Sequence, residues 1–191
     1  MTRKIQRVPV HLDPKDIPAL SAEEIRIILR GADELIMRGG RSLLVKILRG
    51  SQSKDVLDQS LDQSPVYGAY RDLSKEEVLA RVDWVITNGY LAIEYDHRLP
   101  LLVYTQRGWA IEKESYACEL LRSLEEAVDT SCQPIDLAYL NDKNREIIWL
   151  LLEKIEATGD SKYIRLLREW ENIAYKKGKQ RIRALIERLN G

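Results

Sequence analysis

Apolar residues recur three or four positions apart along most of the chain, the spacing that places them on one face of an α-helix. The clearest such face follows Ser74 and consists of Val78, Leu79, Val82, Val85 and Ile86. Ser74 is a suitable N-cap, and Glu77 three residues later completes a capping box with it. Gly89 is the residue most easily placed at positive φ after a helix end. The pattern therefore predicts a helix from Ser74 to Asn88.

The next two segments have strand patterns. Residues 90–95 alternate apolar with smaller or polar side chains, as a half-buried strand does, whereas residues 99–105 are almost continuously apolar. Pro100 has no amide hydrogen to donate, which confines it to an edge position near the start of the second strand. The sequence Asp-His-Arg at 96–98 joins the two runs, so we expect a two-stranded ribbon.

Two shorter helices are predicted before Ser74, at residues 42–48 and around 54–59, with a turn at 65–68. Three helices followed by a two-stranded ribbon is the layout of a winged helix. The helix that follows Ser74 is then the recognition helix, and residues 96–98 form the tip of the wing.

Further segments flank this module. Residues 1–19 contain three prolines and little periodicity, which predicts an extended arm whose Arg3, Lys4 and Arg7 are solvated unless nucleic acid is near. A helix capped by Ser21 and Glu24 follows. We expect it to end at Gly39-Gly40 and to pack on the back of the winged helix.

The remainder of the chain reads as helical, with a long helix at 109–128 and a break at 130–134. Three amphipathic helices follow, and such helices bury their apolar faces by pairing. The expected apolar faces are Ile147, Ile148, Leu151, Leu152 and Ile155, then Tyr163, Leu166, Leu167, Trp170 and Ile173, then Ile182, Leu185, Ile186 and Leu189. The predicted fold class is mainly α with a small β-ribbon, a winged helix followed by a C-terminal α-helical extension. The expected domains are an N-terminal arm (1–19), a winged-helix domain (20–128) and a helical extension (129–191).

The net charge of zero is unfavourable for a nucleic-acid partner. The 30 basic and 30 acidic residues cancel, whereas duplex binding draws much of its strength from neutralised phosphates. The distribution is uneven, because residues 111–140 are mostly acidic and the segment from Tyr175 onward is mostly basic. These segments either pair within one fold, or the basic helix reaches a phosphate backbone.

Four short motifs give the chain a family resemblance. They are Leu48-Arg49-Gly50-Ser51, Tyr67-Gly68, Trp84-Val85-Ile86 with Asn88-Gly89-Tyr90-Leu91, and Val103-Tyr104-Thr105 with Gly108. In order and spacing they resemble the RQC domain, the winged helix that follows the motor of RecQ-family helicases. The resemblance runs from about Asp33 to Lys113. It covers under half of the chain and does not extend to the C-terminal helices. The protein looks like one of the small stand-alone bacterial proteins of the RQC-minor type, which implies DNA binding.

A candidate phosphate-binding turn lies at residues 49–54, where a glycine-containing turn leads into a helix and offers amides, hydroxyls and two cations. The candidate contacts are Arg49, Ser51, Ser53 and Lys54. The same residues also suit an ordinary turn and helix cap, with Arg49 in an internal ion pair. The resemblance implies that Arg49, Ser51 and Ser53 lie at the DNA backbone. Asp55 departs from the family pattern, because DNA-binding relatives tend to carry a basic residue there.

Other candidate contacts lie on the recognition helix and the wing. Arg71, Lys75 and Arg81 precede or lie on the helix, and Arg71 is the best placed for a backbone contact. Acidic Glu76, Glu77 and Asp83 are interspersed, which is more typical of a solvated face than of a base-reading one. At the wing tip, where RQC relatives often carry an aromatic or apolar wedge, His97 could stack on a base and Arg98 could hold a phosphate.

The sequence carries no motif of catalysis or of cofactor or metal binding. The sequence has no Gly-x-x-x-x-Gly-Lys-Ser/Thr loop and no cysteine-rich zinc module, and His11 and His97 lie far apart. We expect no enzyme activity, no cofactor and no metal. No apolar run approaches the roughly 20 residues needed to span a bilayer, and no signal peptide is evident, so a cytoplasmic location is expected.

The leading hypothesis is a non-enzymatic protein that binds duplex or branched DNA mainly through backbone and shape. One alternative is a protein-interaction module that uses the C-terminal helices. Another is binding to structured RNA or to the ribosome, which the basic last helix would suit equally well.

Overall fold

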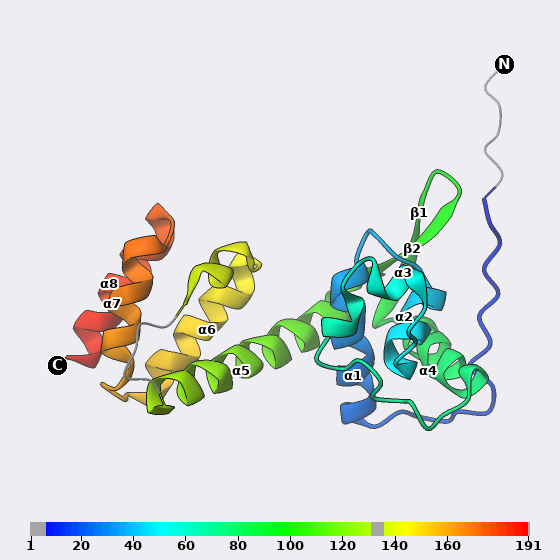
Figure 1. The fold of residues 1–191 in the computed structure, drawn as a ribbon, viewed down its shortest axis with the longest axis horizontal. Helices are drawn as coiled ribbons and strands as arrows, with labels where there is room; N and C mark the ends of the chain where they lie inside the picture. The colour runs from blue at the N-terminus through cyan, green and yellow to red at the C-terminus, as the bar shows by residue number, and fades with distance from the viewer. Residues whose placement is uncertain (1–6, 131–135, 191) are drawn as a thin grey trace, which may run out of the picture. The chain divides into compact units, whose positions relative to one another are not determined.

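The computed structural model describes residues 7–130 and 136–190. Within them the fold is mainly α-helical with a single two-stranded antiparallel sheet, which confirms the predicted fold class (Figure 1). The chain divides into two compact units, Met1–Glu112 and Lys113–Gly191. The long helix α5 (Gln106–Thr130) passes from the first unit into the second. The domain boundary expected after residue 128 stays a prediction, and the division into compact units falls earlier along this helix.

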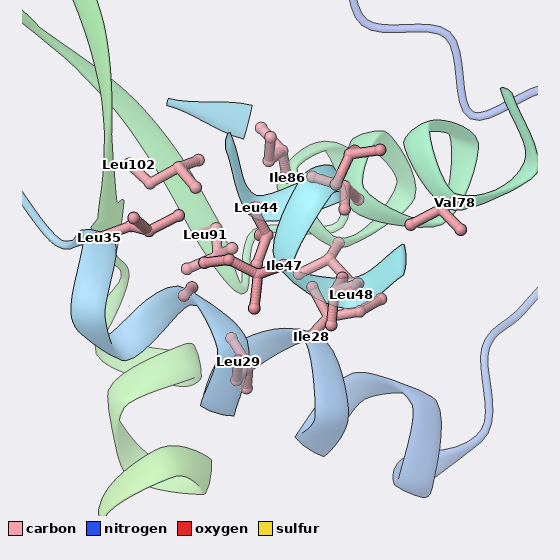
Figure 2. Close-up of a cluster of buried hydrophobic side chains, with 14 of the residues drawn as sticks. Ile28, Leu29, Leu35, Leu44, Ile47, Leu48, Val78, Ile86, Leu91 and Leu102 are labelled. Atoms are coloured by element: carbon pink, nitrogen blue, oxygen red, sulfur yellow. The ribbon is translucent and has the colours of Figure 1, made fainter. Parts of the chain in front are cut away.

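The first unit is a winged helix preceded by one additional helix. Its elements are α1 (Ala22–Ala32), α2 (Arg41–Arg49), α3 (Lys54–Leu57), α4 (Lys75–Thr87), β1 (Leu91–Asp96) and β2 (Leu99–Tyr104), with 3-10 turns at Asp33–Leu35 and Leu61–Gln63. A single apolar core joins α1, α2, α4 and the ribbon (Figure 2). Ile28, Leu44, Leu48 and Leu102 are fully buried in it. Each such side chain contributes about 1.5–3 kcal/mol relative to remaining exposed.

Both predicted capping boxes are present. The Ser21 hydroxyl accepts from the Glu24 amide at 3.2 Å, and the Glu24 carboxylate accepts from the Ser21 amide at 2.9 Å. At α4 the Glu77 amide donates to the Ser74 hydroxyl at 3.2 Å, and the Ser74 amide donates to the Glu77 carboxylate at 2.8 Å. The two helices therefore begin where the sequence predicts.

Helix α1 ends at Ala32 rather than at Gly39-Gly40, so that prediction was wrong. The chain continues through the 3-10 turn and reaches Met37 at φ 59°. The Met37 amide then donates to the Leu102 carbonyl at 3.0 Å, and the Leu102 amide donates to the Gly39 carbonyl at 2.9 Å. The segment leaves the helix because β2 supplies partners for its backbone groups.

The ribbon forms as predicted and is tied to the N-terminal arm. Leu91 pairs with Tyr104 and Asp96 with Leu99, which leaves His97 and Arg98 as the turn. The Val8 amide donates to the Arg98 carbonyl at 3.1 Å, so the arm lies beside the wing tip.

Farther along the arm, Leu12 and Ile17 pack against the core. The arm is therefore held at these two positions, whereas Arg7 is exposed as expected. Arg3 and Lys4 lie outside the described residues.

The second unit contains the rest of α5 with α6 (Arg145–Thr158), α7 (Tyr163–Ile173) and α8 (Lys176–Leu189), and a 3-10 segment at Ala138–Asp142. The predicted helical faces are mostly buried, and Gly159 ends α6 at φ 63°. Ile173 is an exception with 44% of its surface exposed. Most of the predicted break at 130–134 lies outside the described residues.

Charged residues of the second unit pair with one another across its helices. On α8, Arg181 binds Glu153 at 2.8 Å, Arg183 binds Glu171, and Arg188 binds Glu156. Carboxylates of α5 pair likewise, since Lys154 binds Glu114 and Lys162 binds Asp129 at 3.4 Å. The uneven charge was expected either to pair within the fold or to place the basic helix at a phosphate backbone. These arginines pair within the fold.

Candidate nucleic-acid interface

The turn at residues 49–54 begins where α2 ends in a left-handed cap. Gly50 has φ 69°, its amide donates to the Ile47 carbonyl at 2.9 Å, and the Ser51 amide donates to the Lys46 carbonyl at 2.9 Å. These bonds satisfy the last carbonyls of the helix. Backbone hydrogen bonds alone therefore hold the start of the turn in place.

A second turn, around residues 67–71, packs directly on the first. A Cβ atom on Gly50 would lie 3.1 Å from the Cα of Gly68, which is tighter than most Cβ contacts, so a side chain at residue 50 would crowd the second turn. The Gly68 amide also donates to the Ile47 carbonyl at 2.9 Å, and the Tyr70 amide to that of Leu48 at 2.7 Å. The two turns form one rigid edge of the winged helix.

Two of the predicted contacts, Arg49 and Arg71, lie on this edge. The Nε of Arg49 donates to the Leu73 carbonyl at 3.2 Å, and the Nε of Arg71 donates to the Gly68 carbonyl at 3.1 Å. In the part of the chain that the structure describes, no carboxylate pairs with either guanidinium. Each arginine is therefore oriented by one backbone bond and keeps the rest of its five N–H donors for another acceptor. The internal ion pair considered for Arg49 is not formed.

The remaining residues of the turn add hydroxyls and charge. The Ser51 hydroxyl accepts from the Ser53 amide at 3.3 Å, the Ser53 hydroxyl is buried, and Lys54 is exposed. Lys46, which sequence reasoning missed, binds Asp55 at 2.5 Å. The hydrogen bond from Lys46 lowers the pKa of the Asp55 carboxyl below its ordinary value.

The negative charge of Asp55 is therefore neutralised by its salt bridge with Lys46. The cations Lys46, Arg49 and Lys54 against the single carboxylate of Asp55 leave a formal charge of +2 at the turn.

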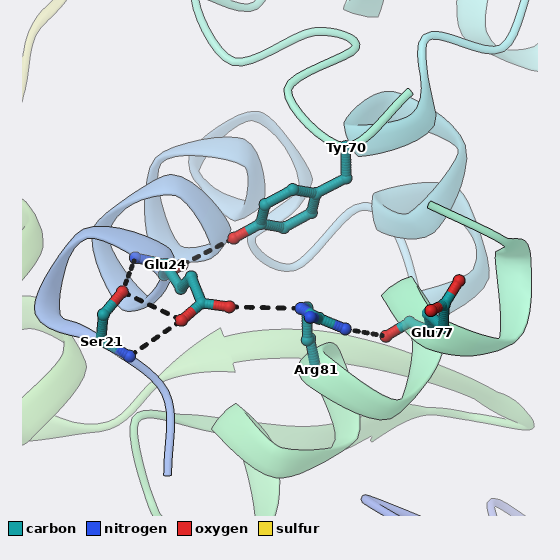
Figure 3. A network of polar contacts seen from close by, with 5 residues as sticks. All are labelled: Ser21, Glu24, Tyr70, Glu77 and Arg81. Carbon is teal, nitrogen blue, oxygen red and sulfur yellow. Dashed lines mark hydrogen bonds and ion pairs between the residues drawn. The ribbon is translucent and has the colours of Figure 1, made fainter. Parts of the chain in front are cut away.

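The recognition helix α4 has fewer side chains available for nucleic acid than its sequence suggested. The Nε of Arg81 donates to the Glu24 carboxylate at 3.2 Å, and its Nη1 donates to the Glu77 carbonyl at 3.2 Å (Figure 3). Arg81 thus braces α4 against α1, which favours a structural role. Tyr70 donates to the Glu24 carbonyl at 3.4 Å, and burial, followed by the Glu24 charge, raises its pKa to about 12.

Asp83 was expected on a solvated face and is instead buried, with 1% of its surface exposed. The Nη1 of Arg41 donates to both of its carboxylate oxygens, at 2.6 and 2.7 Å, and the Asp13 amide donates to one of them at 2.9 Å. This cluster joins the arm, α2 and α4. Of the predicted contacts on α4, Lys75 is left as an exposed cation in the first turn.

The wing tip is exposed and polar, and the strand that leads to it contacts the N-terminal arm. The Nδ1 of His97 lies 2.7 Å from the Asp96 carboxylate, and 80% of the His97 side chain is exposed. Tyr95 on the adjoining strand donates to the Val8 carbonyl at 2.9 Å, and the Arg7 guanidinium lies 4.8 Å from the centre of its ring. Arg98 is also exposed at the tip.

The predicted contacts therefore fall into two groups. The turn edge gathers Arg49, Ser51, Lys54 and Arg71, with Lys75 at the start of the following helix. The predicted hydroxyl contact of Ser53 is wrong, because that hydroxyl is buried. His97 and Arg98 form the separate wing tip. The residues that sequence reasoning missed, Lys46 and Arg41, gave no local signal, because their partners are 9 and 42 positions away.

Among residues 7–130 and 136–190 there is no group of three or more histidine, cysteine or acidic side chains that could hold a metal ion. Over the same residues, no helix is long and apolar enough to cross a membrane.

Comparison with known families gives one match. A family model described as the RQC domain matches residues 21–126, which is more than half of the chain. It covers the winged helix, the helix α1 in front of it and most of α5. Searches of curated proteins and of solved structures find no match.

Proposed function

The chain belongs to the RQC domain family, and on that premise we propose that it is a non-enzymatic nucleic-acid-binding protein that holds duplex or branched DNA. The contacts are made mainly to the sugar-phosphate backbone. Backbone contacts position a protein on a duplex without reading its sequence.

The observation that carries this proposal is the edge made by the two packed turns. Arg49 and Arg71 are each anchored by a backbone carbonyl and neutralised by no described carboxylate. Lys54 adds a third exposed cation. Elsewhere in the chain many cations are paired, as Arg41 with Asp83 and Arg81 with Glu24 illustrate. A rigid cationic edge of this kind suits phosphate oxygens, and guanidinium groups bind these in a bidentate manner.

The recognition helix supports binding by backbone and shape over base reading. Arg81 and Asp83 are committed to internal pairs, which leaves Lys75 among the acidic residues Glu76 and Glu77. Base reading in the major groove relies on bidentate side chains such as arginine, asparagine and glutamine on the inserted helix. The exposed face of α4 offers few of these.

Equilibrium binding of the full chain to three labelled probes tests the proposal: a duplex, a forked duplex and an RNA hairpin of matched length. We expect both DNA probes to bind with affinities that fall steeply as salt is added, with a slope of about −2 to −4, because about two to four phosphates are contacted. We expect the RNA hairpin to compete weakly.

Stronger binding to the RNA hairpin than to either DNA probe would make structured RNA the partner. An affinity for all three probes that does not respond to salt would contradict nucleic-acid binding through phosphates altogether.

A further inference from the structure

The second unit, taken by itself, contains a hollow bounded by α6, α7, α8 and the 3-10 segment, with a volume of about 560 Å³. We call it the α6–α8 pocket. Its floor is apolar and is made by Leu140, Ile148, Leu152, Trp170 and Ile182. Pockets that bind ligands usually measure about 300–1,000 Å³ and are mostly apolar. The hollow is therefore large enough to receive several atoms of an apolar group.

The charge around this pocket has one sign. Among the described residues that line it are four cations, Lys143, Arg145, Lys176 and Lys177, and no carboxylate. Elsewhere in the unit several acidic residues are already engaged, as in the pair between Arg181 and Glu153. Lys176 and Lys177 are exposed, and nothing in residues 136–190 or the rest of the described chain pairs with them.

The position of these two lysines is unfavourable for the free protein. They occupy the first turn of α8, whose N-cap residue Tyr175 forms no side-chain capping bond. Cations at the N-terminal end of a helix oppose its dipole, where carboxylates are the stabilising choice. An anion bound at the pocket would offset the repulsion between these lysines and the positive end of the helix dipole.

Apolar surface also remains uncovered beside the pocket. Tyr175 on its rim is 72% exposed, and the neighbouring Ile173 is 44% exposed. Tyrosine is among the residue types enriched at the energetic centres of protein interfaces.

We propose that the α6–α8 pocket binds an acidic segment of a partner protein. The segment inserts apolar side chains onto the floor beside Trp170 and places carboxylates next to Lys176 and Lys177. An amphipathic helix laid into a groove is one recurrent form of such recognition. This inference concerns the second unit and goes beyond the proposed DNA binding, which uses the first.

Two other occupants fit less well. A nucleobase would leave its polar edge unpaired against the apolar floor, and Asn141, the uncharged amide on the lining, already donates to the Ile173 carbonyl at 3.3 Å. A second copy of this chain docking through the same surface would bring the two cationic rims together, because such an interface is self-complementary. Like charges facing each other oppose association.

Selection of displayed random peptides on the full chain, followed by binding assays with the enriched peptides made synthetically, tests the proposal. We expect enriched sequences to combine apolar residues with Asp or Glu. The charge-reversing variant Lys176→Glu/Lys177→Glu should weaken their binding by about tenfold or more, because like charges then meet. The matched control Arg122→Glu/Arg168→Glu changes exposed cations of α5 and α7 outside the pocket and should bind as the unmodified chain does.

The proposal is wrong if no peptides are enriched, if the enriched peptides lack acidic residues, or if the control loses as much affinity as the pocket variant. Duplex affinity separates this proposal from the preceding one, because Lys176→Glu/Lys177→Glu should leave it unchanged. A fall in duplex affinity equal to the fall in peptide affinity would make the rim a nucleic-acid contact and overturn the proposal.

Discussion

Gly50 and Gly68 touch through their backbones: a Cβ atom on residue 50 would lie 3.1 Å from the Cα of residue 68. Both residues have left-handed φ angles, 69° and 71°. Glycine adopts such angles without the steric penalty that other residues meet. This contact sets the Arg49 turn against the Arg71 turn and so creates the cationic edge.

A comparison of two glycine substitutions tests the importance of this contact. Gly89 has a similar φ, 72°, but open space where a Cβ atom would stand. Gly89→Ala should therefore cost about 1 kcal/mol from backbone strain alone, whereas Gly50→Ala should cost about 2–4 kcal/mol because crowding against Gly68 is added. Urea unfolding of the two variants measures the difference. Equal destabilisation would show that the close approach of the turns is unimportant for stability.

The buried pair of Arg41 and Asp83 predicts an asymmetric pair of substitutions. The Asp83 side chain is 2% exposed and that of Arg41 is 20% exposed. Removing the arginine strands a carboxylate with almost no access to water, which costs about 3–5 kcal/mol, whereas a stranded arginine can reach solvent. Arg41→Met should therefore destabilise the protein more than Asp83→Leu does.

The double variant Arg41→Met/Asp83→Leu is the control for this pair. It should be more stable than Arg41→Met alone, because no unpaired charge then remains buried. Additive losses in a urea-based double-mutant cycle would mean that the two side chains do not interact.

The Glu24 carboxylate makes stability depend on pH. Partial burial opposes its ionisation, but hydrogen bonds from the Ser21 amide and hydroxyl and from Arg81 outweigh that effect and hold its pKa below 4.5. A group whose pKa is lowered on folding contributes stability above its unfolded pKa and loses that contribution as the pH falls through the folded value. Stability should therefore decline below about pH 4.5, and Glu24→Gln should flatten that decline. Unfolding curves of the two proteins with identical acid dependence would contradict this assignment.

The elements that could be predicted from the sequence are those with local signals. Ser74 and Ser21 mark helix starts through neighbours three residues away, and the apolar spacing after Ser74 identifies the buried face of α4. The RQC resemblance implied a backbone contact for Arg49, and the position of Arg71 before the recognition helix suggested one for Arg71. Their convergence depends on Gly50 and Gly68, which are 18 positions apart, so only the folded chain reveals it.

What the sequence could not reveal depends on long-range partners. Arg81 and Asp83 look like ordinary surface charges on a mixed helix, and their roles come from Glu24 and Arg41 elsewhere in the chain. The bond between the Val8 amide and the Arg98 carbonyl, which ties the arm to the wing, likewise follows no sequence pattern.

The wing tip should bind forked DNA without opening it. Separating a base pair needs a side chain that replaces the lost stacking, which aromatic rings supply at about 1–3 kcal/mol per base. His97 is the ring at the tip, while Tyr95 is engaged by Arg7 and Val8 of the arm. We expect no large rise in 2-aminopurine fluorescence at the fork when protein is added, and little change with His97→Ala. A large rise that His97→Ala abolishes would make the wing a strand-separating wedge.

The salt dependence of duplex binding by Arg49→Ala/Lys54→Ala tests the central claim most directly. If the turn contacts phosphates, the variant should bind more weakly across sequences, and the slope of log affinity against log salt should flatten by about one to two units. The control Arg26→Ala/Arg165→Ala removes the same charge from α1 and α7, where each arginine is more than half exposed, and should keep the original slope. An Arg49→Ala/Lys54→Ala protein that is folded and retains both the affinity and the slope of the unmodified chain would contradict the account.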